Sequence, residues 1–163
     1  MRNLTATVCL TIALLLGSAG VSWSQDFGKG FWAYQSGDYA TALREWRPLA
    51  KQGDAVAQLN LGNMYRKGQG VPQNDKTAVR WYRLAAEQGN ADAQTNLGVM
   101  YGMGTGVIRD DVYAHMWFNI AASSGNKRAV KNRDIAAKNM TPSQLEKAQD
   151  LARECVRKKY KGC

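Results

Sequence analysis

Residue types that commonly carry out chemistry are scarce in this chain. Among its 163 residues there are one histidine and three cysteines. A single histidine excludes the multi-histidine sites that hold catalytic zinc or iron, so we expect neither a metal nor a cofactor. His115 is the one candidate general base of its type, but it takes the place of Val79 in an internal repeat described below. We therefore expect a packing or surface role for it.

Two other patterns are associated with catalysis or nucleotide binding. Ser124 and Lys127 match the S-x-x-K pattern of serine-acylating enzymes, which need the serine at the start of a helix and the lysine one turn later. Gly125 places a predicted helix end between them, and no S-D-N or K-T-G partner occurs. The glycine-rich stretch 102–106 has a counterpart at 68–70, which favours a repeated turn over a phosphate-binding loop. We predict no catalytic residue and no enzymatic activity.

Two cysteines near the C-terminus are candidates for a disulfide. Cys155 and Cys163 are eight residues apart, which on a continuous helix would separate them by about 12 Å. A disulfide joins Cα atoms within about 7 Å of each other. The bond therefore requires the helix to end first, and Gly162 gives the chain the freedom to turn back. Two unpaired thiols are the alternative.

The N-terminal segment has the layout of a secretory signal. Arg2 precedes an apolar stretch at 8–16, and small residues follow at 17–20. The apolar run is too short to span a bilayer. Cleavage after Ser24, or alternatively after Gly20, removes Cys9 and leaves two cysteines, as is typical of an exported protein with a disulfide. We expect residues 1–24 to be a signal peptide and the mature protein to be periplasmic or secreted.

The middle of the chain repeats itself. Residues 53–88 and 89–124 are identical at 17 of 36 positions without a gap. The matched positions include glycine, aromatic and alanine residues, among them Leu61/Leu97, Gly62/Gly98, Tyr65/Tyr101, Gly68/Gly104, Gly70/Gly106 and Trp81/Trp117. A repeat of this length indicates a solenoid of stacked helical units.

Each copy is predicted to form two helices joined by a glycine-rich turn. In the first helix, Ala57, Leu61 and Tyr65 are four apart and share one face. A glycine inside this helix is unfavourable by about 1 kcal/mol relative to alanine. Its presence at both Gly62 and Gly98 predicts that another helix backbone approaches closely there.

The second helix of each copy has recognisable ends. Asp75 and Asp111 stand where an N-cap would begin it. Gly89 and Gly125 are placed to end it as C-cap glycines. Between these ends in the first copy, one face is predicted to carry Ala78, Trp81 and Ala85.

Together these positions resemble a known repeat. The pattern A-x-x-x-L-G-x-x-Y-x-x-G-x-G-V, then D-x-x-x-A-x-x-W and A-A-x-x-G, is similar to the Sel1-like repeat, a relative of the tetratricopeptide repeat. Both copies carry it, from Ala57 to Gly89 and from Ala93 to Gly125. The resemblance implies an all-α, right-handed superhelical solenoid of antiparallel helix pairs. It also implies a non-enzymatic scaffold, and the short signal suggests the bacterial cell envelope.

A different activity is associated with some secreted, cysteine-rich Sel1-like proteins, which are linked to β-lactam binding or hydrolysis. This chain lacks the cysteine pair that those proteins carry inside each repeat. Weak β-lactam binding or hydrolysis therefore stands only as an alternative.

The flanks of the two copies complete the predicted solenoid. Residues 25–53 resemble a degenerate tetratricopeptide-like repeat with a shorter turn, and residues 54–88 and 89–124 are the two Sel1-like repeats. Residues 125–163 form a basic C-terminal cap of two helices, the first at about 127–139. Thr141 to Gln144 match a capping box at the start of the second. Its apolar face comprises Leu145, Ala148, Ala152, Cys155 and Val156.

Partner binding is expected on the first helix of each pair, since repeat solenoids expose a concave surface there. In tetratricopeptide-like proteins the ligand-facing positions flank the Leu-Gly-x-x-Tyr core. Carried onto this chain, they are Phe31, Tyr34, Gln35, Val56, Leu59, Asn63, Arg66, Asp92, Thr95, Val99 and Met103. Their mixed chemistry suits an extended peptide or a partner helix, and an ordinary solvated face is the alternative.

The charge of the chain is concentrated at one end. The formal net charge is +9, yet residues 25–124 hold 10 basic and 9 acidic residues, whereas residues 125–163 hold 11 and 4. A cationic cap could bind an anionic membrane or a cell-wall polymer. Export and the lack of an aromatic-basic stacking pattern argue against nucleic acid. We expect a monomer.

Overall fold

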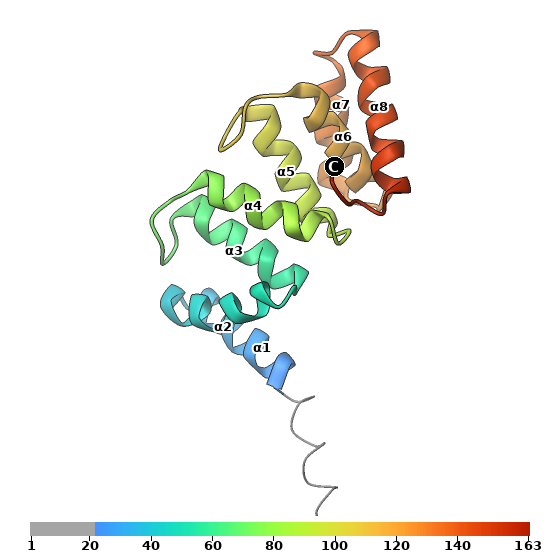
Figure 1. Ribbon diagram of the computed structural model, residues 1–163. Coiled ribbons are helices and arrows are strands. Elements are labelled where there is room, and N and C mark those ends of the chain that lie inside the picture. Colours follow the sequence, from blue (N-terminus) through green and yellow to red (C-terminus); the bar gives the residue numbers. More distant parts are fainter. Residues whose placement is uncertain (1–21) are drawn as a thin grey trace, which may run out of the picture.

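The computed structural model describes residues 22–163, and within them every regular element is an α-helix (Figure 1). The predicted signal segment lies outside the described residues except for positions 22–24. The helices are α1 (Ser22–Gln35), α2 (Tyr39–Lys51), α3 (Ala55–Lys67), α4 (Asp75–Ala86), α5 (Ala91–Met103), α6 (Asp111–Ser123), α7 (Lys127–Ala137) and α8 (Pro142–Arg157). The all-α prediction is confirmed.

The helices form a solenoid of stacked pairs. α1 packs on α2, α3 on α4 and α5 on α6, and each pair contacts the next through α2 with α3 and α4 with α5. The stack rises from α1 to the C-terminal cap, where α7 and α8 both pack on α6 (Figure 1). Within residues 22–163 no helix is long and apolar enough to cross a membrane.

An aromatic ring sits over a glycine in each of the three pairs. The ring belongs to the second helix and the glycine to the first: Trp46 over Gly30, Tyr82 over Gly62, and Phe118 over Gly98. A Cβ atom at Gly62 or Gly98 would lie 2.5 or 2.6 Å from ring carbon. The prediction of a close approach is therefore right in position, but the group that approaches is mainly a side chain and not a helix backbone.

The core has two parts, which Trp81 joins. One cluster lies among α1, α2 and α3 around Trp46, and the other spans α4, α5, α6 and α8 around Tyr82 and Trp117. The predicted face of α4 is correct for its alanines but not for its aromatic residue, because Tyr82 is fully buried whereas Trp81 is half-buried. Trp81 packs against the first cluster and thereby links the two parts.

Side-chain oxygens cap the helices one residue earlier than predicted in both repeats. Asn74 accepts a hydrogen bond from the Thr77 amide, and Asp110 accepts from the Tyr113 amide. Asp75 and Asp111 are instead the first helical residues, where a carboxylate interacts favourably with the helix dipole. The C-cap residues of α4 and α6 are Glu87 and Ser124, and the predicted glycines follow them with left-handed φ.

Buried glutamines connect successive pairs. Gln58 Nε2 donates to the Ala50 carbonyl at 3.0 Å, and Gln94 Nε2 donates to the Ala86 carbonyl at 3.1 Å. Both carbonyls lie in the last turn of the preceding helix, where backbone acceptors lack helical partners. Each repeat is thereby fixed in register with the helix before it.

The long turn of each repeat packs on the preceding second helix. A Cβ atom at Gly70 would lie 2.7 Å from Tyr39 Cβ, and one at Gly106 would lie 2.6 Å from the Asp75 carbonyl carbon. These glycines permit close packing between repeats. The recurrence of the glycine-rich stretch thus has a structural explanation.

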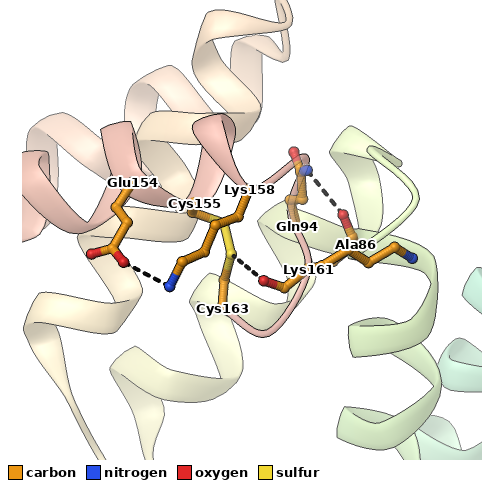
Figure 2. The surroundings of a disulfide bond; sticks show 7 residues. All are labelled: Ala86, Gln94, Glu154, Cys155, Lys158, Lys161 and Cys163. Carbon is orange, nitrogen blue, oxygen red and sulfur yellow. Dashed lines mark hydrogen bonds and ion pairs between the residues drawn. A yellow bond between two sulfur atoms is a disulfide. The ribbon is translucent and has the colours of Figure 1, made fainter.

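The chain ends in a disulfide-closed loop (Figure 2). α8 begins with the predicted capping box of Thr141 and Gln144 and ends at Arg157. Lys159 and Tyr160 then adopt left-handed φ, and the Cα atoms of Cys155 and Cys163 come within 5.6 Å and are bridged. The bridge holds the tail, residues 158–163, against the last repeat.

The tail and α8 both contribute to the core, and one residue of the predicted apolar face of α8 lies outside it. Tyr160 packs against the larger core cluster, with its ring 3.2 Å from where a Cβ atom of Gly89 would lie. Leu151 also packs against this cluster, whereas Val156, predicted to be apolar-facing, is exposed. Ala148, Ala152 and Cys155 are buried as predicted, and the partly buried Leu151 packs beside them in place of Val156.

Candidate functional site

The first helices of the two repeats and α7 together line a polar hollow of about 340 Å³. It contains four of the predicted surface residues, from α3 and α5, together with three that the sequence analysis did not single out. Its lining residues are Leu59, Asn63, Arg66, Lys67, Asp92, Asn96 and Arg128. Three helices separated in sequence therefore contribute to one site.

A second hollow of about 260 Å³ lies between α5, α6 and α7, and because most of its lining residues are apolar we call it the apolar hollow. Val99 and Met103 are the predicted residues in it, and α7 adds Ile135. Met103 is 72% exposed and Ile135 is 50% exposed, so both present large apolar surface to solvent. The remaining lining residues are Gly102, Arg109, Asp111, Ala114, Phe118, Asn132, Ala136 and Asn139.

The two hollows adjoin along α5. Asn96 of the polar hollow and Val99 of the apolar hollow are three residues apart, which places them on neighbouring positions of one helix surface. Asn63 and Val99 occupy equivalent positions in the two repeats, yet one is polar and the other apolar. The residue before each is a glycine in both repeats. The polar hollow and the apolar hollow form one continuous candidate binding surface.

Hydrogen bonds fix the amides of the polar hollow. Asn63 Oδ1 accepts from Tyr82 Oη at 2.8 Å and from Asn96 Nδ2 at 3.3 Å. Asn96 Oδ1 in turn accepts from Arg128 Nη2 at 2.8 Å. Burial raises the pKa of Tyr82 to about 12, against the opposing effect of the nearby Arg66 charge. The tyrosine therefore remains a protonated donor at neutral pH.

The polar hollow carries more positive than negative charge. Arg66, Lys67 and Arg128 face a single carboxylate, Asp92. Asp92 Oδ1 already accepts a hydrogen bond from Asn126 Nδ2 at 2.9 Å. The hollow therefore suits a ligand with a negative group or with hydrogen-bond acceptors.

The prediction of a partner-facing position is wrong for one residue, Thr95. Thr95 is fully buried, and its hydroxyl donates to the Ala91 carbonyl one turn earlier at 2.7 Å. Its side chain is thus directed back onto its own helix and away from any partner.

The predicted residues of the first pair do not line either hollow. Tyr34 is half-buried: its hydroxyl donates to Gln69 Oε1 at 2.9 Å and its ring packs on Trp46. Phe31, Gln35 and Val56 are exposed. The structure thus concentrates the candidate surface on α3, α5 and α7, and not on α1.

The residues considered for catalysis are not arranged for it. His115 is 3% exposed on α6, and burial, followed by the charge of Arg133, lowers its pKa. Ser124 ends α6 and Lys127 begins α7, so they do not occupy successive turns of one helix. Within the described residues, no three histidine, cysteine, aspartate or glutamate side chains are grouped to hold a metal.

Comparison with known proteins agrees with this architecture. The family model of the Sel1 repeat matches residues 55–90 and 91–126. The chain is similar to the structure of a protective antigen, present in uropathogenic Escherichia coli strains, that displays an SLR fold. The TM-score is 0.80 at 32% identity, covering 85% of this chain and 31% of that one.

A Sel1 repeat protein from Oxalobacter formigenes is also similar in structure. Its TM-score is 0.61 at 36% identity, covering 64% of this chain and 41% of that one. The chain therefore spans less than half the length of either similar structure. Among curated proteins, no sequence matches it.

Stacked helix pairs, an aromatic ring over a glycine in each, and a surface along the first helices define a helical repeat solenoid. The matched repeats and similar structures then identify the particular kind of repeat: residues 55–126 are two Sel1 repeats. This fold is commonly a protein-interaction scaffold, and its members are generally non-catalytic.

Proposed function

We propose that this protein is a non-enzymatic scaffold of the bacterial cell envelope that binds a peptide or protein segment along α3, α5 and α7. The observation that supports it most strongly is the pair of adjoining hollows on these helices. Six of the predicted surface residues line them. Repeat solenoids bind extended partners on such surfaces because several short helices contribute side chains in succession.

The envelope location rests on two features of the chain. The N-terminal segment has the pattern of a cleaved signal. The Cys155–Cys163 bridge is of a kind that persists in oxidising compartments and is rare in the cytosol. Fractionation of the native cells with an antibody, together with N-terminal sequencing of the mature chain, tests this location and the cleavage site. Recovery of the full-length chain in the cytosol would contradict it.

The binding surface is tested by affinity capture from the native envelope with residues 25–163 as bait. Met103→Ala in the apolar hollow is expected to weaken capture of a specific partner. Leu84→Ala is the matched control, since Leu84 is also an exposed apolar residue but lies on the second helix α4. Equal capture by both variants and the wild type would contradict a contribution of the apolar hollow to partner binding.

A second candidate function is electrostatic attachment to an anionic membrane or cell-wall polymer through the C-terminal cap. Three ion pairs within the cap involve Arg133, Arg153 and Lys158. Eight other basic residues are exposed and outside these ion pairs: Lys127, Arg128, Lys131, Lys138, Lys147, Arg157, Lys159 and Lys161. Co-sedimentation with anionic vesicles or sacculi at low and high salt tests this function, because screening abolishes attachment of this kind.

A further inference from the structure

Most of the free hydrogen-bonding groups of the polar hollow are donors. Both hydrogen bonds at Asn63 Oδ1 come from within the protein, which leaves the amide N–H groups of Asn63 for a ligand. Arg66 Nε is buried and has no hydrogen-bond partner in the part of the chain that the structure describes. Lys67 is exposed beside them. The carboxylate of Asp92 is already engaged by Asn126.

A hollow in which donors and positive groups outnumber acceptors favours a ligand acceptor that carries negative charge. A buried N–H group without an acceptor is unfavourable, and Arg66 would remove that penalty by turning its guanidinium toward a carboxylate in the hollow. Three positive groups against one carboxylate give the hollow a small excess charge. That excess matches a single carboxylate better than a highly charged polymer.

The two repeats differ where their surfaces meet a ligand. Lys67 and Met103 are equivalent positions, as are Asn63 and Val99, yet the first member of each pair is polar and the second apolar. Packed helices are about 8–10 Å apart, which an extended peptide covers in about three residues. A peptide lying across α3 and α5 would therefore place different side chains in the two hollows.

From this juxtaposition we infer that the ligand is an extended peptide with a carboxylate in the polar hollow and an apolar side chain, about three residues away, in the apolar hollow. The inference rests on the proposed function and names the chemistry of the partner segment. The carboxylate belongs to an acidic side chain or to a chain terminus.

The test measures binding of synthetic peptides to residues 25–163 by fluorescence anisotropy. Two C-terminally amidated peptides in a glycine-serine background carry glutamate three positions before or after leucine. Each has a glutamine analogue and an analogue with serine in place of leucine. The peptide in which glutamate follows leucine also has a version that ends in a free C-terminal carboxylate in place of the glutamate. The last version distinguishes a terminal from a side-chain carboxylate.

We expect replacement of the carboxylate by an amide to weaken binding about tenfold, as for loss of one charge-assisted hydrogen bond. Arg66→Gln should remove this preference but leave the preference for leucine over serine. Met103→Ala should do the reverse. Lys67→Gln, at an exposed position, gives a second test of the polar hollow if Arg66→Gln fails to fold, and Arg80→Gln on α4 is the matched surface control.

Equal binding of the glutamate and glutamine peptides, or binding of neither, overturns the inference. An envelope partner that is captured by the wild type and lost with Met103→Ala would still support the proposed scaffold function in that case. The scaffold function at this surface would be contradicted if neither hollow affected capture. In that case Met103→Ala and the variant used for the polar hollow, Arg66→Gln or Lys67→Gln, would both capture as much partner as the wild type.

Discussion

The disulfide at the end of α8 should contribute measurably to the stability of the whole C-terminal half. The perturbation is Cys163→Ser, which removes the bridge at its less buried end. Cys155 is 2% exposed and packs in the larger core cluster. Replacing Cys155 instead would also remove buried volume and confuse the result.

The magnitude follows from the length of the closed loop. The bridged residues are separated by 8 positions. The chain-entropy relation for a loop of this length gives about 2.5 kcal/mol. For a domain of this size a loss of that amount lowers Tm by about 5–10 °C. The full amount is expected only if the tail is docked in the native state, as the packing of Tyr160 against the core indicates.

The assay is thermal and urea unfolding of residues 25–163, followed by circular dichroism with and without reductant. Oxidised wild type should unfold at a higher temperature than Cys163→Ser, and reduction should bring the two together. Thiol titration before each scan verifies the redox state. Coincident unfolding of the oxidised wild type and the variant would refute the reasoning, because the tail would then be independent of the folded core.

Three further predictions test the architecture by urea or pH-dependent unfolding. Gly98→Ala should destabilise the protein by about 1–3 kcal/mol because its Cβ would meet the ring of Phe118 at 2.6 Å. Adding Phe118→Leu should recover part of the loss. An unchanged unfolding midpoint for Gly98→Ala would contradict the close contact. Asn74→Ala should reduce stability by about 1 kcal/mol and Asp75→Ala by less, since Asn74 is the N-cap. A larger loss for Asp75→Ala would instead support Asp75 as the N-cap, as the sequence predicts. His115 has a lowered pKa in the folded state, so the unfolded chain binds a proton more readily, and stability should be greatest above the ordinary value of 6.5 and fall as pH decreases below it. His115→Gln should flatten this part of the profile, and an unaltered profile would assign the dependence to other groups.

The features that sequence analysis predicted well are local or repeated. The capping box at Thr141 depends on residues within one helical turn, and the glycine positions at Gly62 and Gly98 recur at a fixed interval. Because the same physical requirement appears twice, the pattern is visible without a structure. The bridge at Cys155 likewise follows from a short separation and a helix end between its cysteines.

The errors arise where orientation or distant sequence decides the environment. A step from Trp81 to Tyr82 rotates the side chain by about 100° around α4, and periodicity alone does not fix which of two adjacent aromatic residues enters the core. Thr95 is buried although its repeat equivalent, Leu59, is only partly so. Arg128 was assigned to the cap, and only the packing of α7 beside α5 brings it into the polar hollow.

The position of α8 has a consequence for how such an array can lengthen. α7 and α8 both cover α6, and the disulfide-closed tail reaches back to Gly89 at the start of the last repeat. A new unit joined after this tail would meet an end that is already covered. A unit inserted between α6 and α7 would instead offer a second helix equivalent to α6, on which the existing cap could dock unchanged. On this side of the stack, an added repeat therefore fits the present cap only between α6 and α7.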